Sequence, residues 1–186
     1  MTHLHAAAAT LVATLAAFAC SPSPGTEGPA PETVASGTFH DSAGARTGVA
    51  TLIDTAGALR LDLSASQLSP GPHGLHFHST GVCTPPDFKS AGGHFNPEGK
   101  EHGRLNPNGP HAGDLPNIYA GTDGSVDTSI TLSHDLGTSG SHSILQPSDT
   151  SPGGVALVIH AGPDDERTDP SGNSGDRVAC AVIEPG

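Results

Sequence analysis

The sequence predicts an all-β protein, an antiparallel β-sandwich or flattened barrel with two long functional loops. Short apolar runs alternate with polar residues at every second position, and they are separated by many of the 25 Gly and 17 Pro of this 186-residue chain. Such punctuation is typical of short strands joined by turns. After the N-terminal segment, no stretch shows the helical period of about 3.6 residues. The length fits one domain of about 150 residues plus an N-terminal extension.

The strands are expected one after another from about Val34. Residues 49–53 and 59–63 both alternate, and the turn signal at 54–57 separates them, so the two runs predict a β-hairpin. Three further strands are predicted at residues 126–132, where apolar side chains share one face, at 154–160 (GVALVIH), and at 178–183 (VACAVI).

Two segments lack strand patterning and are too long to be simple connections. Residues 79–117 are rich in Gly, Pro and His, and residues 161–176 are rich in Asp and Gly. Long loops within a compact domain are usually functional or disordered. The histidines of the first loop favour a functional role.

The N-terminus resembles an export signal. The apolar run at 11–20 (LVATLAAFAC) is too short to span a bilayer and ends in small residues before Cys20. We therefore expect a lipoprotein-like signal peptide at 1–20 with Cys20 as the lipidation candidate, a Pro/Ser/Gly-rich linker at 21–33 and a domain at 34–186. A plain secretory signal is the alternative. Either signal predicts an exported protein of the periplasm or cell envelope, and lipid on Cys20 would anchor it there.

The charge balance limits the classes of partner that the protein can bind. The formal net charge is −12, with only seven Lys and Arg. Such a chain repels nucleic acid and anionic membranes, so we expect no nucleic-acid partner and membrane contact only through an N-terminal lipid. The chain has three cysteines, Cys20, Cys83 and Cys180. If lipid occupies Cys20, the other two can pair in an oxidising compartment, and two unpaired buried thiols are the alternative.

Several histidines have the spacing of metal ligands. In HGLHFH, His76 and His78 project to the same face of a strand, although a surface strand can also carry two histidines without function. His160, at the end of an apolar strand, can reach them across the sheet. An all-imidazole site suits Cu(II).

The first long loop offers a second set of ligands. His94, His102 and His111 are spaced eight and nine residues apart, and Asp114 follows His111. Three imidazoles and a carboxylate suit tetrahedral Zn²⁺, and the metal would supply folding energy that this loop otherwise lacks. One residue has to be shared between the two sites, and His94 is the candidate.

Seven separated motifs together resemble the copper/zinc superoxide dismutase family, over about residues 33–183. The motifs are HGLHFH, Cys83, GGHFNP, KEHG, HAGDLPN, VIHAGPDD and GNSGDRVACAVI. The resemblance implies a Greek-key β-sandwich that binds a copper ion and a zinc ion. It also implies that superoxide is dismuted to molecular oxygen and hydrogen peroxide at a redox-cycling copper, bridged to zinc through a shared histidine.

The resemblance also assigns individual residues. It implies copper ligands His76, His78, His94 and His160, and zinc ligands His94, His102, His111 and Asp114. It further implies a disulfide between Cys83 and Cys180, an active-site arginine at Arg177, and an outer aspartate, Asp164, that bonds one histidine of each metal. His94, as the bridge, is the second catalytic candidate, while His73 corresponds to a structural histidine.

One alternative function remains, a non-catalytic periplasmic copper- or zinc-buffering protein that uses the same ligands. Arg177 favours the enzyme, because a metal carrier has no need of a fixed cation beside an open copper position. The second loop contains no lysine and several acidic residues, which limits the electrostatic steering that an anionic substrate would experience. The resemblance is compatible with a homodimer as well as a monomer.

Overall fold

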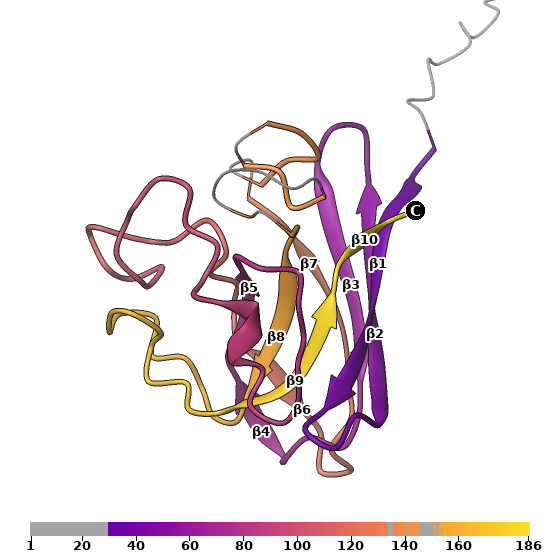
Figure 1. Cartoon of the computed structure of the whole chain (residues 1–186), viewed down its shortest axis with the longest axis vertical. Coiled ribbons are helices and arrows are strands. Elements are labelled where there is room, and N and C mark those ends of the chain that lie inside the picture. The colour runs from indigo at the N-terminus through magenta and orange to yellow at the C-terminus, as the bar shows by residue number, and fades with distance from the viewer. Residues whose placement is uncertain (1–29, 134–135, 141, 146–150, 152) are drawn as a thin grey trace, which may run out of the picture.

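The computed structural model describes residues 30–133, 136–140, 142–145, 151 and 153–186 (Figure 1). The predicted signal peptide, Cys20 and most of the predicted linker lie outside the described residues. Within the described part of the chain, the one helical element is a short 3-10 turn, η1 (Lys89–Ala91). No helix there is long and apolar enough to cross a membrane.

In the described part of the chain ten antiparallel strands build the fold, among them the strands that the alternating patterns predict. The first five are β1 (Glu32–Asp41), β2 (Arg46–Asp54), β3 (Leu59–Ala65), β4 (Gly71–His73) and β5 (Leu75–His78). The others are β6 (Ile118–Ala120), β7 (Val126–Thr131), β8 (Ala156–His160), β9 (Arg177–Val182) and β10 (Glu184–Pro185). The main sheet has the order β5-β8-β9-β1-β2-β3-β7, with β10 paired to β1, and β4 and β6 form a separate ribbon.

The main sheet curls around one apolar core. In Figure 1, β1, β2 and β3 lie on one side of the molecule, and β5 and β8 lie on the other. Buried side chains from both sides belong to one cluster, for example Phe39 and Leu61 from the first side and Phe77, Leu157 and Ile159 from the second. Burying each large apolar side chain contributes roughly 1.5–3 kcal/mol. The predicted β-sandwich or flattened barrel is therefore confirmed.

The predicted hairpin is confirmed as β2 and β3, which are paired from Gly48 with Ala65 to Asp54 with Leu59. The turn between them is closed by the Asp54 carboxylate, which accepts the backbone N–H of Gly57 at 2.7 Å. Gly57 has a φ of 94°, a conformation that glycine adopts without steric cost. The predicted strands at 126–132, 154–160 and 178–183 correspond to β7, β8 and β9.

The two predicted long loops are also present. The segment 79–117 connects β5 to β6, and the segment 161–176 connects β8 to β9. Both extend from the same side of the molecule, next to β5 (Figure 1). We call them the first and the second long loop.

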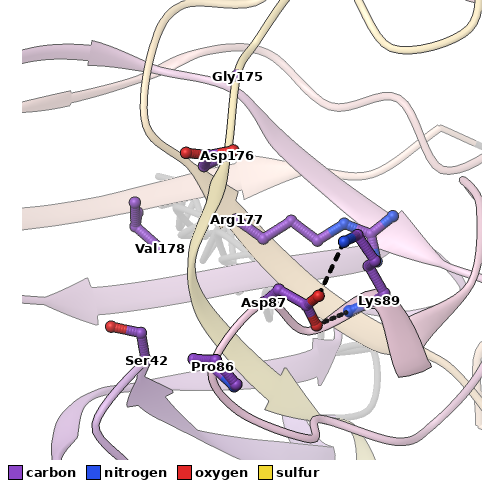
Figure 2. Close-up of a pocket in the computed structure, with 8 residues that line it drawn as sticks. All are labelled: Ser42, Pro86, Asp87, Lys89, Gly175, Asp176, Arg177 and Val178. Carbon is purple, nitrogen blue, oxygen red and sulfur yellow. Dashed lines mark hydrogen bonds and ion pairs between the residues drawn. The ribbon is translucent and has the colours of Figure 1, made fainter.

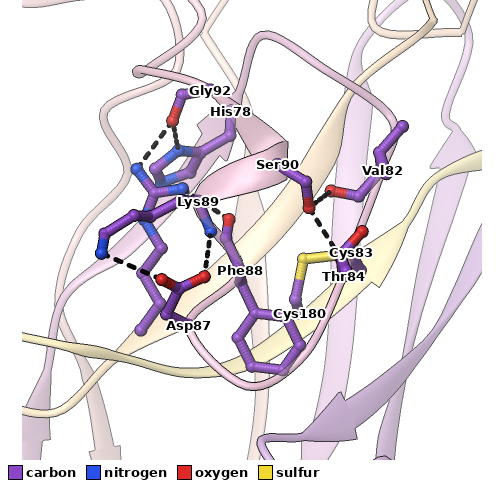
Figure 3. Close-up of a disulfide and its surroundings, with 11 residues drawn as sticks. His78, Val82, Cys83, Thr84, Asp87, Phe88, Lys89, Ser90, Gly92 and Cys180 are labelled. Carbon is purple, nitrogen blue, oxygen red and sulfur yellow. Dashed lines mark hydrogen bonds and ion pairs between the residues drawn. A yellow bond between two sulfur atoms is a disulfide. The ribbon is translucent and has the colours of Figure 1, made fainter.

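A disulfide attaches the first long loop to the sheet. Cys83 of the loop and Cys180 of β9 form the bridge, with an S–S distance of 2.00 Å (Figure 3). The bridge adjoins a small apolar cluster in which Phe88 and Ala91 of the loop cover Ala156 and Val158 of β8. The alternative of two unpaired thiols is therefore wrong.

Candidate metal centre

Strand alternation separates core residues from candidate ligands on β5. Leu75 and Phe77 point into the main core, so His76 and His78 point to the opposite face, where they are also fully buried. On the neighbouring β8, His160 lies two residues after Val158. Val158 belongs to the small apolar cluster beside the disulfide, which lies on the face opposite the main core. The backbone N–H of His160 donates to the carbonyl oxygen of Gly74 at 2.9 Å, which fixes the end of β8 beside β5.

The first long loop returns to the free edge of β5. The N–H of Phe77 donates to the carbonyl oxygen of Gly113 at 2.9 Å, and the N–H of Phe95 donates to the carbonyl oxygen of Phe77 at 2.8 Å. These bonds pair His94 with His78 and Asp114 with His76. The edge of the sheet thereby brings loop-borne ligand candidates to the strand-borne ones.

Four imidazoles form the first cluster. The ligand-capable atoms of His76, His78, His94 and His160 all lie within 4.8 Å of one another. Nδ1 of His76 and Nε2 of the other three are buried and have no hydrogen-bond partner. Buried ring nitrogens without partners are costly unless something else engages them. A metal ion at their centre fits this set of four nitrogens.

The other ring nitrogen of these imidazoles is engaged by oxygen. Nε2 of His76 lies 2.8 Å from Asp164 Oδ2, Nδ1 of His78 lies 3.0 Å from the carbonyl oxygen of Gly92, and Nδ1 of His160 lies 3.2 Å from that of Gly175. Since these oxygens accept hydrogen bonds, each outer nitrogen carries the proton and each inner nitrogen keeps its lone pair.

Burial also favours the neutral form of three of these imidazoles, His78, His94 and His160, because it lowers the pKa of each. It lowers the pKa of His94 to about 4, and burial together with the nearby His76 lowers the pKa of His160 to about 3. Burial also holds the pKa of His78 well below its ordinary value. A neutral imidazole is the form that binds a metal, so these three side chains are in the binding form at neutral pH.

The second cluster combines three imidazoles and a carboxylate, His94, His102, His111 and Asp114, with donor atoms again within 4.8 Å of one another. Asp114 Oδ1 lies 2.8 Å from Nδ1 of His94 and 3.2 Å from Nδ1 of His111. Nδ1 of His102 lies 3.1 Å from Asp114 Oδ2 without forming a hydrogen bond. The four groups therefore converge on one point, as tetrahedral Zn²⁺ requires.

Asp114 is held as an anion by its surroundings. Burial alone would raise its pKa, but the three imidazoles around it, His102, His111 and His94, outweigh burial and hold the pKa far below the usual range. Its Oδ2 also accepts the backbone N–H groups of Gly103 and His111, both at 3.0 Å. The carboxylate is therefore fixed within the loop as well as charged.

Asp164 connects the two clusters from outside, as the resemblance implies. Its two carboxylate oxygens lie 2.8 Å from Nε2 of His76 and 2.9 Å from Nε2 of His102. Asn117 fixes the Asp164 backbone with two hydrogen bonds of 2.8 Å, one donated by Nδ2 to the carbonyl oxygen and one accepted by Oδ1 from the N–H. Sequence reasoning gave Asn117 no role, although it is the last residue of the HAGDLPN motif and lies three residues after the ligand candidate Asp114.

Arg177 lies beside the first cluster. Its Nη1 donates to the carbonyl oxygen of Phe88 and its Nη2 to that of Gly92, both at 2.7 Å. An open pocket of about 390 Å³ is lined by Arg177 together with residues of both clusters, among them His78, His94 and His160. A small anion in this pocket would therefore meet a fixed guanidinium beside the histidines.

Nearby charged groups are paired with one another. Figure 2 shows a pocket that Arg177 also lines, in which the exposed Lys89 forms an ion pair with Asp87 at 2.9 Å. In the second long loop, Arg167 donates to the carbonyl oxygen of Leu105 at 3.2 Å.

His73 is buried between the carbonyl oxygens of His160 and Ser69, each 2.7 Å from a ring nitrogen, and joins neither cluster, which agrees with a structural role.

The antiparallel β-sandwich carries two adjoining clusters, one of imidazoles alone and one of imidazoles with a carboxylate. These donor sets suit two different ions, so the fold and the site define a metalloprotein with two metal sites. Comparison with known proteins identifies the family. A family model described as copper/zinc superoxide dismutase (SODC) matches residues 46–183. Superoxide dismutase (Cu-Zn) 2 of Aquifex aeolicus (strain VF5) is 48% identical over 137 residues, which cover 73% of this chain and 78% of the relative.

Two further similarities come from Bacillus subtilis. The superoxide dismutase-like protein YojM of strain 168 is 45% identical over 126 residues, covering 67% of this chain and 62% of that protein. A crystal structure of a SOD-like protein from this organism aligns with a TM-score of 0.72 at 40% identity, covering 79% of this chain and 96% of the other. The chain belongs to the copper/zinc superoxide dismutase family, and it is a superoxide dismutase that uses copper and zinc.

Proposed function

We propose that the chain dismutes superoxide at a copper site that shares His94 with a zinc site. In the overall reaction, two superoxide ions and two protons give one O₂ and one H₂O₂. The observation that carries the proposal is the orientation of His94, which belongs to both clusters. Its Nε2 is a partnerless atom of the first cluster, while its Nδ1 lies 2.8 Å from Asp114 in the second.

In this proposal His76, His78, His94 and His160 hold copper, and His94, His102, His111 and Asp114 hold zinc. When bound, copper supplies a one-electron couple between Cu(II) and Cu(I), and zinc supplies a fixed positive charge. His94 then holds or gives up a proton at Nε2 while its Nδ1 stays engaged on the zinc side. A buried imidazole with this freedom is well suited to deliver one of the two protons that the peroxide product requires.

Arg177 binds and orients the anion in this proposal. Two of its N–H groups are engaged by Phe88 and Gly92, so the guanidinium cannot swing away from the pocket. A fixed cation attracts superoxide and repels none of the neutral imidazoles around it. In a chain of net charge −12, this local charge is the main source of attraction that the pocket offers.

The test is superoxide decay followed by stopped-flow in the copper- and zinc-loaded protein. We expect a rate constant near the diffusional ceiling of roughly 10⁸–10⁹ M⁻¹s⁻¹, lost when copper alone is removed. Loading with zinc alone serves as the control. Slow decay in a protein that holds both metals at full occupancy would contradict the proposal.

A non-catalytic copper- or zinc-buffering protein is the second candidate. It is favoured by the name of the Bacillus relative, which is described as superoxide dismutase-like, and by the acidic, lysine-free second loop. Full metal occupancy with slow superoxide decay is the result that this candidate predicts. The presence of Arg177 in the pocket supports the enzyme instead.

We also propose that residues 1–20 are a lipoprotein-like signal, that Cys20 is lipidated, and that the linker predicted at 21–33 joins it to the domain in the periplasm or cell envelope. The domain begins two residues earlier than predicted, because β1 starts at Glu32. Mass spectrometry of the membrane fraction tests the lipidation. A mature protein that starts at a lipid-modified Cys20 is expected, whereas an unmodified soluble product would contradict anchoring. The resemblance is compatible with both a homodimer and a monomer, and analytical ultracentrifugation of the metal-loaded protein distinguishes the two.

A further inference from the structure

The two long loops are joined directly to each other beside the second cluster. The N–H of Leu105 donates to the carbonyl oxygen of Glu166 at 2.9 Å, and Arg104 forms an ion pair with the Glu166 carboxylate at 2.8 Å. Gly103 has a φ of 108°, and a Cβ there would collide with the same carbonyl oxygen of Glu166. The second long loop is therefore held in backbone contact with the loop that carries His102 and His111.

An internal set of hydrogen bonds also fixes the shape of the second long loop. The Asp165 carboxylate accepts the backbone N–H groups of Arg167 at 2.9 Å and Thr168 at 2.8 Å, and an N–H of the Asn173 side chain at 2.9 Å. These bonds close a tight turn, which leads directly into Asp169. The position of Asp169 is thus determined by both the turn and the contact between the loops.

Asp169 faces two histidines of the second cluster. Its Oδ1 accepts the backbone N–H of His102 at 2.7 Å, and the same oxygen lies 3.9 Å from Nε2 of His111. The first distance is a hydrogen bond, and the second is longer than one but places the carboxylate beside the outer ring nitrogen of His111. Since Nδ1 of His111 faces Asp114 inside the cluster, Nε2 is its outer nitrogen.

Metal-binding imidazoles are oriented by an acceptor at their outer nitrogen. His102 has such an acceptor in Asp164, at 2.9 Å, and the corresponding carboxylate facing His111 is Asp169. We propose that Asp169 is a positioning residue of the zinc site, which holds the backbone of His102 and orients the ring of His111 from the second long loop. Asp169 is not one of the four converging ligand candidates, and the proposal rests on the zinc assignment made above.

The experiment uses the full chain loaded with copper and zinc. Zinc affinity is measured by competition with a chromophoric chelator in the wild type, D169A and D169N. E166Q is the matched control, because it removes one negative charge and the ion pair to Arg104 from the same loop but keeps the backbone bond between Leu105 and Glu166 and touches neither histidine. As a second readout, Co(II) replaces zinc and its visible absorption spectrum reports ligand geometry at that site.

We expect D169A to weaken zinc binding about ten-fold or more and to alter the Co(II) spectrum. D169N keeps an oxygen for the N–H of His102 but loses the charge, so its affinity should lie between D169A and the wild type. E166Q should stay within about three-fold of the wild type, since an ion pair at the surface contributes little. Copper affinity should remain unchanged in all three variants.

Two results would overturn the inference alone. The first is that the wild type binds zinc tightly and D169A binds it equally tightly. The second is that D169A and E166Q weaken zinc binding equally, which would indicate general loosening of the loop. A wild type that holds no zinc would instead overturn the proposed function, and this inference with it.

Discussion

The two clusters share His94 but are built on different parts of the fold. In the first cluster, His76 and His78 lie on β5 and His160 lies at the end of β8, so sheet pairing fixes three of its four imidazoles. In the second, every member lies in the first long loop, which contains no strand between β5 and β6. Strand ladders position ligands before any metal arrives, whereas a loop relies on side-chain hydrogen bonds and on the metal.

The comparison indicates where each cluster is vulnerable. The strand-borne cluster is protected by the core residues that alternate with its ligands, such as Leu75 and Phe77. The loop-borne cluster depends on contacts from outside, chiefly the Asp164 bridge and the bonds of Asn117 that hold it. Substitutions should therefore affect the two sites unequally, unless they fall on the residue that both share.

The largest effect is expected for His94→Ala, the change that removes the shared residue. Both clusters lose a ligand, so copper and zinc should both bind more weakly, and superoxide decay should fall by more than about a hundred-fold, beyond the range seen for outer positions. Metal analysis and stopped-flow decay provide the measurement. His40→Ala, on the exposed part of β1, is the control. Retention of tight zinc binding would show that the second cluster does not need His94.

Removing the disulfide should have the next largest effect, because it frees the first long loop from β9. The bridge spans a sequence separation of 97 residues, and closing a loop of that size stabilises a fold by roughly 4–5 kcal/mol in the chain-entropy model. Cys83→Ala should lower the free energy of unfolding by about that amount, measured by urea unfolding of the metal-free protein. The wild type in reductant should behave like the variant, and a change below about 1 kcal/mol would contradict the assigned role.

Gly172→Ala should weaken the second cluster more than the first. A Cβ at Gly172 would overlap the Asp164 carboxylate and come within 2.7 Å of Nε2 of His102. Displacing Asp164 removes the outer partner of His102, so zinc affinity should fall about 10–100-fold, as measured by chelator competition. Copper should be affected less, because His76 remains fixed on its strand. Gly140→Ala, also at positive φ but with nothing within 4 Å, is the control for backbone strain. Equal zinc affinity in the two variants would rule out this explanation.

Arg177→Ala should have the smallest effect on the metals and a moderate effect on rate. Both clusters keep all their ligands, so full loading is expected, while loss of the fixed cation should slow superoxide decay about ten-fold or more. Adding salt should slow the wild type, because it screens the attraction by Arg177, and should not slow the variant, in which only the repulsion by the net negative charge remains to be screened. A rate equal to that of the wild type would remove Arg177 from the mechanism.

Strand periodicity and the spacing of histidines predicted much of this structure. The alternating runs correspond to strands, and the two segments without a period are the two long loops, because neither contains a face that a sheet could bury. The histidines were recognisable because few functions require so many imidazoles in so short a segment. Their grouping into two sets was inferred from the ligand types that each metal prefers, with the family resemblance adding Asp164 and Arg177.

Contacts between loops were not predictable in the same way. Asn117 is a single polar residue between the apolar Leu115 and Ile118, and Asp169 is one of several acidic residues in a polar loop. In neither place does the sequence distinguish a residue that fixes a neighbour from one that is merely solvated. The return of the first long loop to β5 depends on backbone bonds of Phe95 and Gly113, which leave no pattern in side chains. Such contacts depend on three-dimensional proximity alone, so only the structure places them.

That return of the loop to β5 has a consequence for solubility. β5 is the last strand of the main sheet, and an uncovered edge strand is a template for pairing with another chain. Here the backbone of residues near His94 and Asp114 occupies the hydrogen-bonding groups of β5 that would otherwise be open. The segment that carries the zinc-ligand candidates is therefore also the segment that closes the sheet, so a metal bound there would at the same time hold this edge away from other molecules.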